Sequence, residues 1–485
     1  MTVRDADPLS ADMIDSHVRW RWALFALVVA ELAAGLETTL MFAALPTALK
    51  VVGRPAEVGW LITGYLLVSA AAAAICGRLG DLFGRRRVLL ITLGLATAGS
   101  FVSALSPDVH WIVAGRAVQG LAGAVLPLCY GLLQETLPPA KVPLGIGIIS
   151  AANSFSAAAG FIIGGIIVDS THWQSIFICS ALLALAGFIT CLAYIPKSLQ
   201  RHAAGRLDVL GGILFAPAVA MLLWAVTMFQ QRGAASATPW GWLGASILLL
   251  ALWFFHERRH PQPTVDVRLL GNRRILASNM AAICASLGAL QVLQVFPILL
   301  QQPIWTGVGF GLTATLTGLL KLPSNLTSVI GASWGGALCA RWDGRTIMIG
   351  AAISSLGAWA LMWVNHHSLW LTVVLVCFSS AGFTTLFTSV INIVVATAPE
   401  DRTSEAAAMT ATFRTVAQSI GSQIITLLFA AELVKQATGP AYPAPAAHEA
   451  VMVYMVLASA GALAAALWVP PRRGPFNGIR GEVLA

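Results

Sequence analysis

Long apolar segments alternate with short polar ones along almost the whole chain. Each apolar segment holds about 20 residues, the length that an α-helix needs to cross the hydrocarbon core of a bilayer. Backbone groups in lipid must be hydrogen-bonded within the protein, so we expect helices and not open strands. The pattern predicts fourteen membrane spans, at about residues 22–49, 57–77, 88–105, 109–133, 144–168, 174–195, 208–230, 239–256, 274–302, 311–340, 346–364, 368–397, 404–432 and 450–470.

Longer polar segments divide these spans into groups of six, two and six. We therefore expect an all-α polytopic membrane protein, with two six-helix bundles and a two-helix insert between them. An even number of spans returns the chain to the side where it began, so both termini are expected in the cytoplasm. The expected divisions are an N-terminal tail at 1–21, a bundle at 22–196, a linker at 197–207, the insert at 208–258, a cytoplasmic loop at 259–273, a bundle at 274–470 and a C-terminal tail at 471–485.

The composition agrees with a protein that lies almost entirely in the membrane. Only 10% of its residues are charged and 57% are hydrophobic, whereas a soluble globular protein carries roughly 25% charged residues. The polar segment before the first span lacks the apolar core and small-residue cleavage site of a removable signal, so we expect the first span to be kept. All seven cysteines fall within expected spans, so no disulfide framework is expected.

The net charge of +8 sets orientation rather than indicating a nucleic-acid partner. Most of the 29 Lys and Arg residues fall in the tails and alternate loops that we assign to the cytoplasm, as the positive-inside rule requires. These basic residues would contact anionic lipid. The exceptions in the opposite loops are Lys50, Arg54, Arg232 and Lys435, and those within spans are Arg116, Lys321 and Arg414.

The segment from Gly77 to Arg87, between the second and third spans, combines glycines, one carboxylate and several arginines. Glycines allow a tight turn with positive φ, and a carboxylate can accept charge-assisted hydrogen bonds at a helix end. We expect a cytoplasmic gate in which a charged latch opens and closes one face, and its residues are Gly77, Asp81, Gly84, Arg85 and Arg86. The segment 335–345 resembles a decayed copy, with Ala340 in place of the carboxylate.

Several motifs, in order, resemble those of the major facilitator superfamily, and most closely its fourteen-helix drug:proton antiporters. The segment 77–87 is similar to the family's loop signature between helices 2 and 3. The segment 116–124 resembles the helix 4 motif, 36–46 the helix 1 motif with Glu37 where Asp is usual, 60–66 the start of helix 2, and 413–421 a helix 13 pattern around an arginine. The resemblance covers about residues 22–470 and implies a transporter that is not an enzyme.

The helix 5 motif of these antiporters is matched only in part. Its glycines correspond to Gly147, Gly160, Gly164 and Gly165. Phe161 stands where the family has proline and Ser156 where it has glycine, and Gln174 interrupts the usual Trp-Arg-Trp of helix 6. These departures weaken the expectation of antiport without removing it.

Ionisable residues within spans are costly to bury and are candidates for function. The resemblance assigns a proton-coupling role to Arg116, and Gln119 lies one turn from it on the same helix face. Glu37 and Glu31 could hold and release a proton between conformations. Because they are six residues apart on one helix, they are not expected to face the same cavity. Glu37 is the preferred proton carrier, and Glu31 is a second candidate that could pair with a neighbouring helix.

Lys321 belongs to a polar stripe formed by Thr313, Thr317, Ser324 and Ser328, with Asn325 beside it. Such a stripe should line water or substrate rather than lipid. A lysine at this position could bind an anionic or zwitterionic group of the substrate, or it could form an ion pair with an acid of the first span. The alternative is a lysine whose ammonium group reaches the membrane interface. Arg414 and Gln418 form a second polar face. The expected substrate cavity comprises Lys321, Asn325, Thr317, Arg414, Gln418, Gln119, Phe42, Tyr65, Tyr130 and Phe155.

The segment from His256 to His260 spells the zinc-protease pattern HExxH. Pro261 ends any helix directly after it, and two arginines stand between the histidines, so a basic membrane-interface belt explains it better than a metal site. No Gly-rich phosphate loop ending in Lys-Ser/Thr occurs. We therefore expect no metal, no cofactor and no ATPase within the chain.

The sequence favours proton-coupled efflux of small amphipathic molecules or drugs by alternating access in the plasma (inner) membrane. The expected partners are a small-molecule substrate, protons and membrane lipids, with no nucleic acid, and the expected state is a monomer. Two alternatives stay open: a dedicated exporter of one anionic or zwitterionic metabolite or lipid, and a membrane sensor or scaffold that transports nothing.

Overall fold

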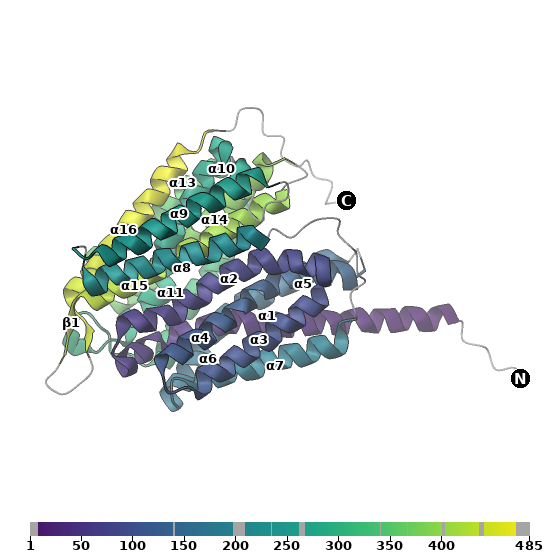
Figure 1. The fold of residues 1–485 in the computed structure, drawn as a ribbon, viewed down its shortest axis with the longest axis horizontal. Helices are drawn as coiled ribbons and strands as arrows, with labels where there is room; N and C mark the ends of the chain where they lie inside the picture. Colours follow the sequence, from purple (N-terminus) through teal and green to yellow (C-terminus); the bar gives the residue numbers. More distant parts are fainter. Residues whose placement is uncertain are drawn as a thin grey trace, which may run out of the picture.

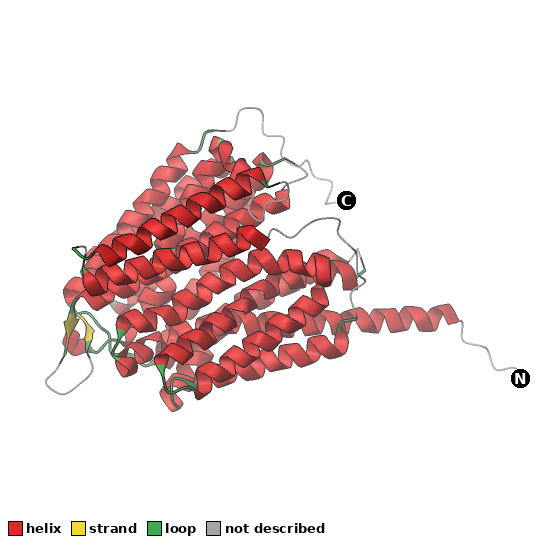
Figure 2. Ribbon diagram, in the orientation of Figure 1, coloured by secondary structure: helices red, strands yellow, loops and turns green. Residues whose placement is uncertain are grey.

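The structure is a computed structural model that describes residues 8–138, 141–196, 209–233, 235–260, 267–339, 341–365, 367–399, 403–435 and 441–471. Nearly all of this part of the chain is helical (Figure 2). Its first helices are α1 (Pro8–Val52), α2 (Pro55–Phe83), α3 (Arg85–Leu105), α4 (Val109–Gln119), the 3-10 helix η1 (Gly120–Ala124), α5 (Val125–Thr136), α6 (Val142–Ser170) and α7 (Ser175–Tyr194). The insert is α8 (Val209–Arg232) and α9 (Ala237–Arg259).

The rest of the chain continues the same pattern. Its helices are η3 (Val267–Gly271), α10 (Arg273–Leu287), η4 (Ala289–Gln291), α11 (Val292–Gln301), η5 (Ile304–Thr306), α12 (Ala314–Cys339), α13 (Gly344–Val364), α14 (Leu369–Thr397), α15 (Thr403–Ala431) and α16 (Pro445–Trp468). Two short strands, β1 (Leu433–Val434) and β2 (Tyr442–Pro443), pair antiparallel between α15 and α16. This hairpin lies outside the expected spans, so the all-α class is unchanged.

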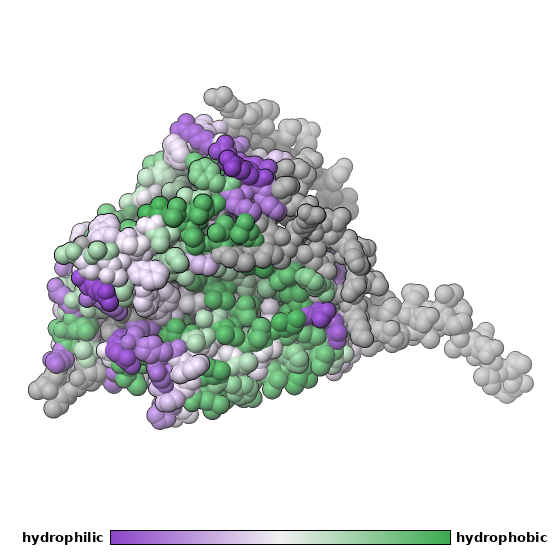
Figure 3. Space-filling view, in the orientation of Figure 1, coloured by the Kyte–Doolittle hydropathy of each residue, from purple (hydrophilic) through white to green (hydrophobic). Residues whose placement is uncertain are grey.

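The helices are long because their apolar length matches a membrane. Among the described residues, eleven helical segments are long and apolar enough to cross a bilayer. The three other expected spans are α2, whose apolar part is the shorter Glu57–Ala73, and α12 and α15, which carry Lys321 and Arg414. Figure 3 shows hydrophobic residues over the middle of both halves of the molecule, with hydrophilic residues gathered toward the helix ends.

The first expected span, 22–49, matches the apolar part of α1, Trp20–Val52. The helix itself extends back to Pro8, and proline is well suited to the first position of a helix. Two details differ from the sequence expectation. The span expected at 274–302 is broken at Gly288, where α10 ends and η4 begins. The span expected at 109–133 contains the 3-10 segment η1, which includes Gly120 and Gly123. Both breaks fall at glycine, the residue that disfavours a helix interior most after proline.

The helices pack as two groups. Helices α1–α7 contact one another and form the N-terminal bundle, and α10–α16 form the C-terminal bundle. Helix α8 packs on α9 and lies against both α2 and α15. The bundles meet where α6 packs on α12, α2 on α15 and α1 on α11. Figure 1 shows their ribbons diverging toward the end from which the start of α1 protrudes.

Hydrogen bonds between the bundles mark one end of the molecule. The Asp169 carboxylate, at the end of α6, accepts from the first backbone N–H groups of α12, Ala314 at 3.0 Å and Thr315 at 2.7 Å. Thr63 donates to Gln423 Oε1 at 3.0 Å, which joins the first half of α2 to the second half of α15. We call this the Asp169 end, and the opposite end, which carries Gly84, the Gly84 end.

Candidate functional site

A buried relay of polar side chains connects Glu37 on α1 to Arg116 on α4. The Ser100 hydroxyl lies 3.2 Å from Glu37 Oε1, and Gln119 Nε2 donates to that hydroxyl at 2.6 Å. Arg116 Nη1 donates to Gln119 Oε1 at 2.9 Å. Each of these side chains is at most 3% exposed. The two charged residues that the sequence singled out are therefore in one hydrogen-bonded chain, with Ser100 as a link that sequence reasoning missed.

Arg116 is held by α2 as well as by the relay. Its Nε donates to the Leu61 carbonyl at 3.0 Å, and its guanidinium lies 4.3 Å from the centre of the Tyr65 ring. The Tyr65 hydroxyl accepts from Thr38 at 3.0 Å, which returns the network to α1. A guanidinium with a carbonyl, an amide and an aromatic face as partners can stay charged in an apolar surrounding.

Close approach of α3 and α4 places the relay. A Cβ on Gly99 would lie 2.6 Å from the Gly115 carbonyl oxygen, and a Cβ on Gly115 would lie 2.6 Å from that of Gly99. No other residue allows the two backbones to cross at this distance. The crossing brings Ser100 beside Gln119.

Glu31 faces another helix. Asn153 of α6 donates to Glu31 Oε1 at 2.6 Å, and the side chain of Glu31 is 1% exposed. The two acids of α1 thus contact α6 and α3 respectively, in keeping with the helical spacing. Chemically, each carboxyl could carry a proton, but within the described residues only Glu37 is connected to Arg116 by the contacts above.

The polar stripe of α12 is buried only in part. Its buried members are Thr317, Lys321 and Ser324. Asn325 and Ser328 are half-buried, and Thr313, just before α12, is exposed. The hydroxyls of Thr317, Ser324 and Ser328 donate to carbonyls of their own helix, at 2.9, 2.9 and 2.8 Å. Lys321 is 1% exposed, and its Nζ lies 5.4 Å from the centre of the Phe296 ring on α11. Asn325 Nδ2 is buried without a hydrogen-bond partner. The stripe is therefore satisfied internally except at Lys321 and Asn325.

The second polar face, on α15, lies against α14. The Arg414 guanidinium is 4.9 Å from the centre of the Phe387 ring, and its Nε is buried without a partner. The Gln418 carbonyl accepts from Gln291 of η4 at 2.8 Å.

Of the four aromatic residues expected in the substrate cavity, Phe42 and Tyr65 lie in one apolar core cluster, and the other two lie outside it. Phe42 is 1% exposed and belongs to the apolar core where the bundles meet, and Tyr65 lies beneath Arg116. Tyr130 is half-buried on α5, and Phe155 is 65% exposed on α6. A cavity role for these residues stays a prediction.

The gate segment turns between α2 and α3 as expected. Gly84 has φ of 93° and ends α2, which requires glycine. Arg85 Nη1 pairs with Glu135 of α5 at 3.2 Å and donates to the Gly131 carbonyl at 2.9 Å. Sequence reasoning missed Glu135. The side chains of Gly77 and Asp81 lie outside the described residues, so an Asp81–arginine latch stays a prediction.

The expected decayed copy makes a matching contact in the other bundle. Arg86 donates to the Leu192 carbonyl near the end of α7, at 2.8 Å. Arg345 donates to the Leu467 carbonyl near the end of α16, at 3.2 Å. Asp343 pairs with Arg274 at 2.7 Å. Ala340, the expected site of the lost carboxylate, lies outside the described residues.

The helix 5 glycines differ in what they touch. A Cβ on Gly164 would lie 2.9 Å from the side chain of Ala43 on α1, and one on Gly160 would overlap Thr39. A Cβ on Gly165 would lie 2.5 Å from the Ala314 carbonyl on α12. Around Gly147 nothing lies within 4 Å, so this glycine makes no close helix contact.

The contact of Thr63 with Gln423 extends to the insert. Gln423 Nε2 donates to Thr227 of α8 at 2.8 Å, so one buried amide links both bundles and α8. Neither this link nor the Asp169 contact was expected. In the sequence, an acid at the end of a span is usually explained as an interfacial residue. A threonine in an apolar helix is usually explained as bonding its own backbone.

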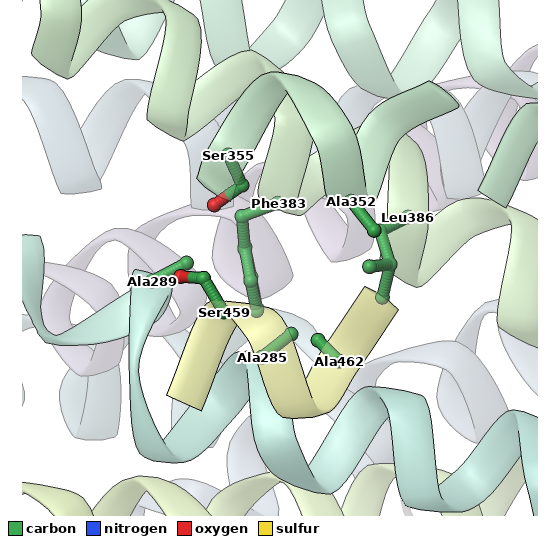
Figure 4. Close-up of a pocket in the computed structure, with 8 residues that line it drawn as sticks. All are labelled: Ala285, Ala289, Ala352, Ser355, Phe383, Leu386, Ser459 and Ala462. Carbon is green, nitrogen blue, oxygen red and sulfur yellow. The ribbon is translucent and has the colours of Figure 1, made fainter. Parts of the chain in front are cut away.

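A crevice in the C-terminal bundle and the HExxH segment of α9 both lie apart from the relay. The crevice inside the C-terminal bundle is lined by small side chains of α10, η4, α13 and α16 together with Phe383 and Leu386 of α14 (Figure 4). In the HExxH segment, Glu257 is buried and accepts from Trp253 Nε1 at 3.1 Å, so this carboxylate is engaged within α9.

Comparison with known proteins gives a consistent answer. The family model described as Major Facilitator Superfamily matches residues 27–422. A tetracenomycin C resistance and export protein of Streptomyces glaucescens is 25% identical over 84% of this chain and 76% of its own length. The multidrug resistance protein Stp of Mycobacterium tuberculosis is 30% identical over 77% of this chain and 69% of its own. A crystal structure of the nucleoside transporter NupG superposes with a TM-score of 0.66 at 11% identity, covering 93% of this chain and 100% of NupG.

Proposed function

The chain belongs to the major facilitator superfamily, and from that premise we propose that it exports small amphipathic molecules in exchange for protons. It is a multi-pass transport protein of the plasma membrane and not an enzyme. In the proposed arrangement, fourteen helices cross the bilayer and both termini lie in the cytoplasm. The bundles at 22–196 and 274–470 are related by a pseudo-two-fold axis, and the matching contacts of Arg86 and Arg345 support that relation.

The relay from Glu37 to Arg116 is the observation that carries the proposal. An ionised carboxylate only accepts hydrogen bonds, whereas a protonated carboxyl can also donate one. The one hydroxyl proton of Ser100 can go to Glu37 Oε1 at 3.2 Å or to the Ala96 carbonyl at 2.9 Å. Protonation of Glu37 would therefore reverse its bond with Ser100, whose hydroxyl would then donate to Ala96. Loss of the negative charge would also remove the attraction between Glu37 and Arg116. Both changes give a proton a means of acting on α1, α3 and α4 together.

Alternating access would follow from rocking of the bundles. The hydrogen bonds of Asp169 and Thr63 hold the Asp169 end closed. To open that end the protein must break these bonds and bring the bundles together at the Gly84 end. A proton that enters from outside would neutralise Glu37 and lower the affinity for the outgoing substrate. The loop around Gly84, with Arg85 bound to Glu135, would then act as the cytoplasmic gate.

A relative named for resistance and export supports the outward direction, and a second relative named for multidrug resistance supports a drug-like substrate. The rival interpretation, a sensor or scaffold, predicts that no compound moves across the membrane.

The test is transport by purified protein in liposomes. An imposed pH gradient, acidic on the side that receives the exported molecule, should drive accumulation of fluorescent amphiphiles. Collapse of the gradient with nigericin should stop it, and liposomes without protein are the control. If no amphiphile in a panel of cationic, neutral and anionic compounds moves with the gradient, the export proposal fails.

A further inference from the structure

Lys321 is a buried cation without a counter-ion in the part of the chain that the structure describes. Its side chain is 1% exposed. No ion pair or hydrogen bond of its Nζ is found among the described residues. Its Nζ lies 5.4 Å from the centre of the Phe296 ring. A buried charge is costly unless it is paired, so its retention indicates a function.

The two acids that could have neutralised it are engaged elsewhere. Glu37 bonds to Ser100 of α3, and Glu31 bonds to Asn153 of α6. The acidic residues in the described part of the C-terminal bundle lie at the ends of its helices or just beyond them: Asp343, Glu405, Glu432 and Glu449. Among the described residues of this bundle, Lys321 and Arg414 have no ion pair with an acid.

Snorkelling does not explain Lys321 in this conformation. The residue lies seven positions after the start of α12, or about 10 Å along the helix axis. A lysine that reaches the interface leaves its ammonium group in water, whereas this side chain is buried. The ordinary interpretation of a lysine within a span therefore fails here.

The surroundings of Lys321 fit an oxyanion attached to an apolar body. One turn along, Asn325 offers a buried Nδ2 donor that has no acceptor, and residues four apart share a helix face. One turn before, Gly318 packs against the backbone of Phe161 on α6, which puts this part of α12 at the contact between the bundles. Phe296 supplies an aromatic face in the same place.

We propose that Lys321 and Asn325 form a binding site for a carboxylate or comparable oxyanion of the transported molecule, with Phe296 against its apolar part. The proposal rests on the export function proposed above and specifies its substrate class as anionic or zwitterionic amphiphiles. The ammonium would form a charge-assisted hydrogen bond with the carboxylate, and Asn325 would donate a second one. Binding then supplies the counter-ion that the described residues do not provide for Lys321.

The experiment compares an aromatic carboxylate fluorophore with its methyl ester, which has the same shape without the charge. Binding is measured with purified protein in detergent, and transport is measured in liposomes. The variants are Lys321→Met, Lys321→Arg and Asn325→Leu. Lys50→Met is the matched control, because Lys50 is an exposed lysine at the end of α1.

Wild type should bind the carboxylate more tightly than the ester. Lys321→Met should weaken carboxylate binding about ten- to a hundredfold, the range expected for a lost charge-assisted hydrogen bond, and should leave ester binding unchanged. Lys321→Arg should recover most of the loss, and Asn325→Leu should weaken the carboxylate by a smaller factor. Lys50→Met should resemble wild type. Retained ester binding shows that the variants are folded.

The assignment is overturned if Lys321→Met binds the carboxylate as wild type does, or if it loses both compounds equally, because Lys321 would then serve folding or proton transfer. It is also overturned if wild type prefers the ester. Failure of the export function looks different: wild type would move neither compound across the liposome membrane, while binding in detergent would still report on the site.

Discussion

Glu37 and Arg116 are joined through Ser100 and Gln119, and no ion pair connects them directly in the described structure. This arrangement separates the proton-binding group from the cation by two side chains that can each donate and accept. Protonation of Glu37 is therefore transmitted to Arg116 by reorientation of hydrogen bonds. This costs less free energy than breaking a buried ion pair, because a broken ion pair leaves an uncompensated charge.

Ser100→Ala tests the relay. The substitution leaves the Gln119 amide without its acceptor, at a cost of about 1–3 kcal/mol. We expect substrate to equilibrate down its own gradient as in wild type, while protons moved per substrate fall to a tenth or less, as reported by a pH-sensitive dye in liposomes. Ser103→Ala is the control, because Ser103 is buried on the same helix and its hydroxyl bonds the Ile112 carbonyl. Equal coupling in the two variants would rule out a relay.

Asp169→Asn should favour opening of the Asp169 end. The carboxylate interacts with the positive end of α12, a contribution of about 1 kcal/mol, so its loss should shift the ratio of conformations about fivefold. Spin labels at Thr171 and Ile304, in a cysteine-free background, would measure the distance between the two bundles at this end. A larger fraction of molecules should show the longer distance. Asp108→Asn is the control, since Asp108 caps α4 within one bundle. The same shift in both variants would contradict a role for Asp169 between the bundles.

Thr227→Val should loosen α8 from the two bundles. Gln423 Nε2 would lose its buried acceptor, at about 1–3 kcal/mol, and hydrogen exchange in α8 should become faster. Thr190→Val removes a hydroxyl that bonds only its own helix α7 in the described structure, and it should leave exchange in α8 as in wild type. Unchanged protection of α8 in Thr227→Val would show that Gln423 does not hold the insert.

Gly165→Val should hinder closure of the Asp169 end, because its Cβ would already meet the Ala314 carbonyl at 2.5 Å. We expect transport to fall at least tenfold with normal amounts of folded protein. Gly147→Val, on the same helix with open space around it, should transport nearly as wild type does. If the two variants are impaired equally, the contact between α6 and α12 is not what requires glycine.

The sequence predicted the elements well because apolar length alone determines where a helix can cross a membrane. It also predicted the turn at Gly84 and the placement of Glu37 and Glu31 on different faces of α1, since both follow from local geometry. The breaks at Gly288 and in η1 were missed because a glycine inside an apolar run is common in membrane helices. The extension of α1 to Pro8 was missed because that segment is polar.

The partners in the site were harder to predict than its charged members. Arg116 and Glu37 stand out as ionisable residues in apolar segments, but Ser100 and Thr227 do not, because serine and threonine usually bond their own helix backbone. Their importance depends on which helices cross, and that depends on tertiary packing such as the Gly99–Gly115 contact. Glu135 was missed for the same reason, since it meets Arg85 only after α5 packs beside the loop.

Glu37→Gln tests the central claim most directly, when exchange and proton-driven transport are measured on the same liposomes. Glutamine keeps the size of the side chain and cannot carry a proton. We predict that Glu37→Gln exchanges labelled for unlabelled substrate across the membrane at nearly the wild-type rate, and that it no longer accumulates substrate against a gradient when a pH difference is imposed. Glu57→Gln, at an exposed ion pair with Arg54, should retain both activities. Proton-driven accumulation by Glu37→Gln at the wild-type level would contradict the assignment of proton coupling to Glu37.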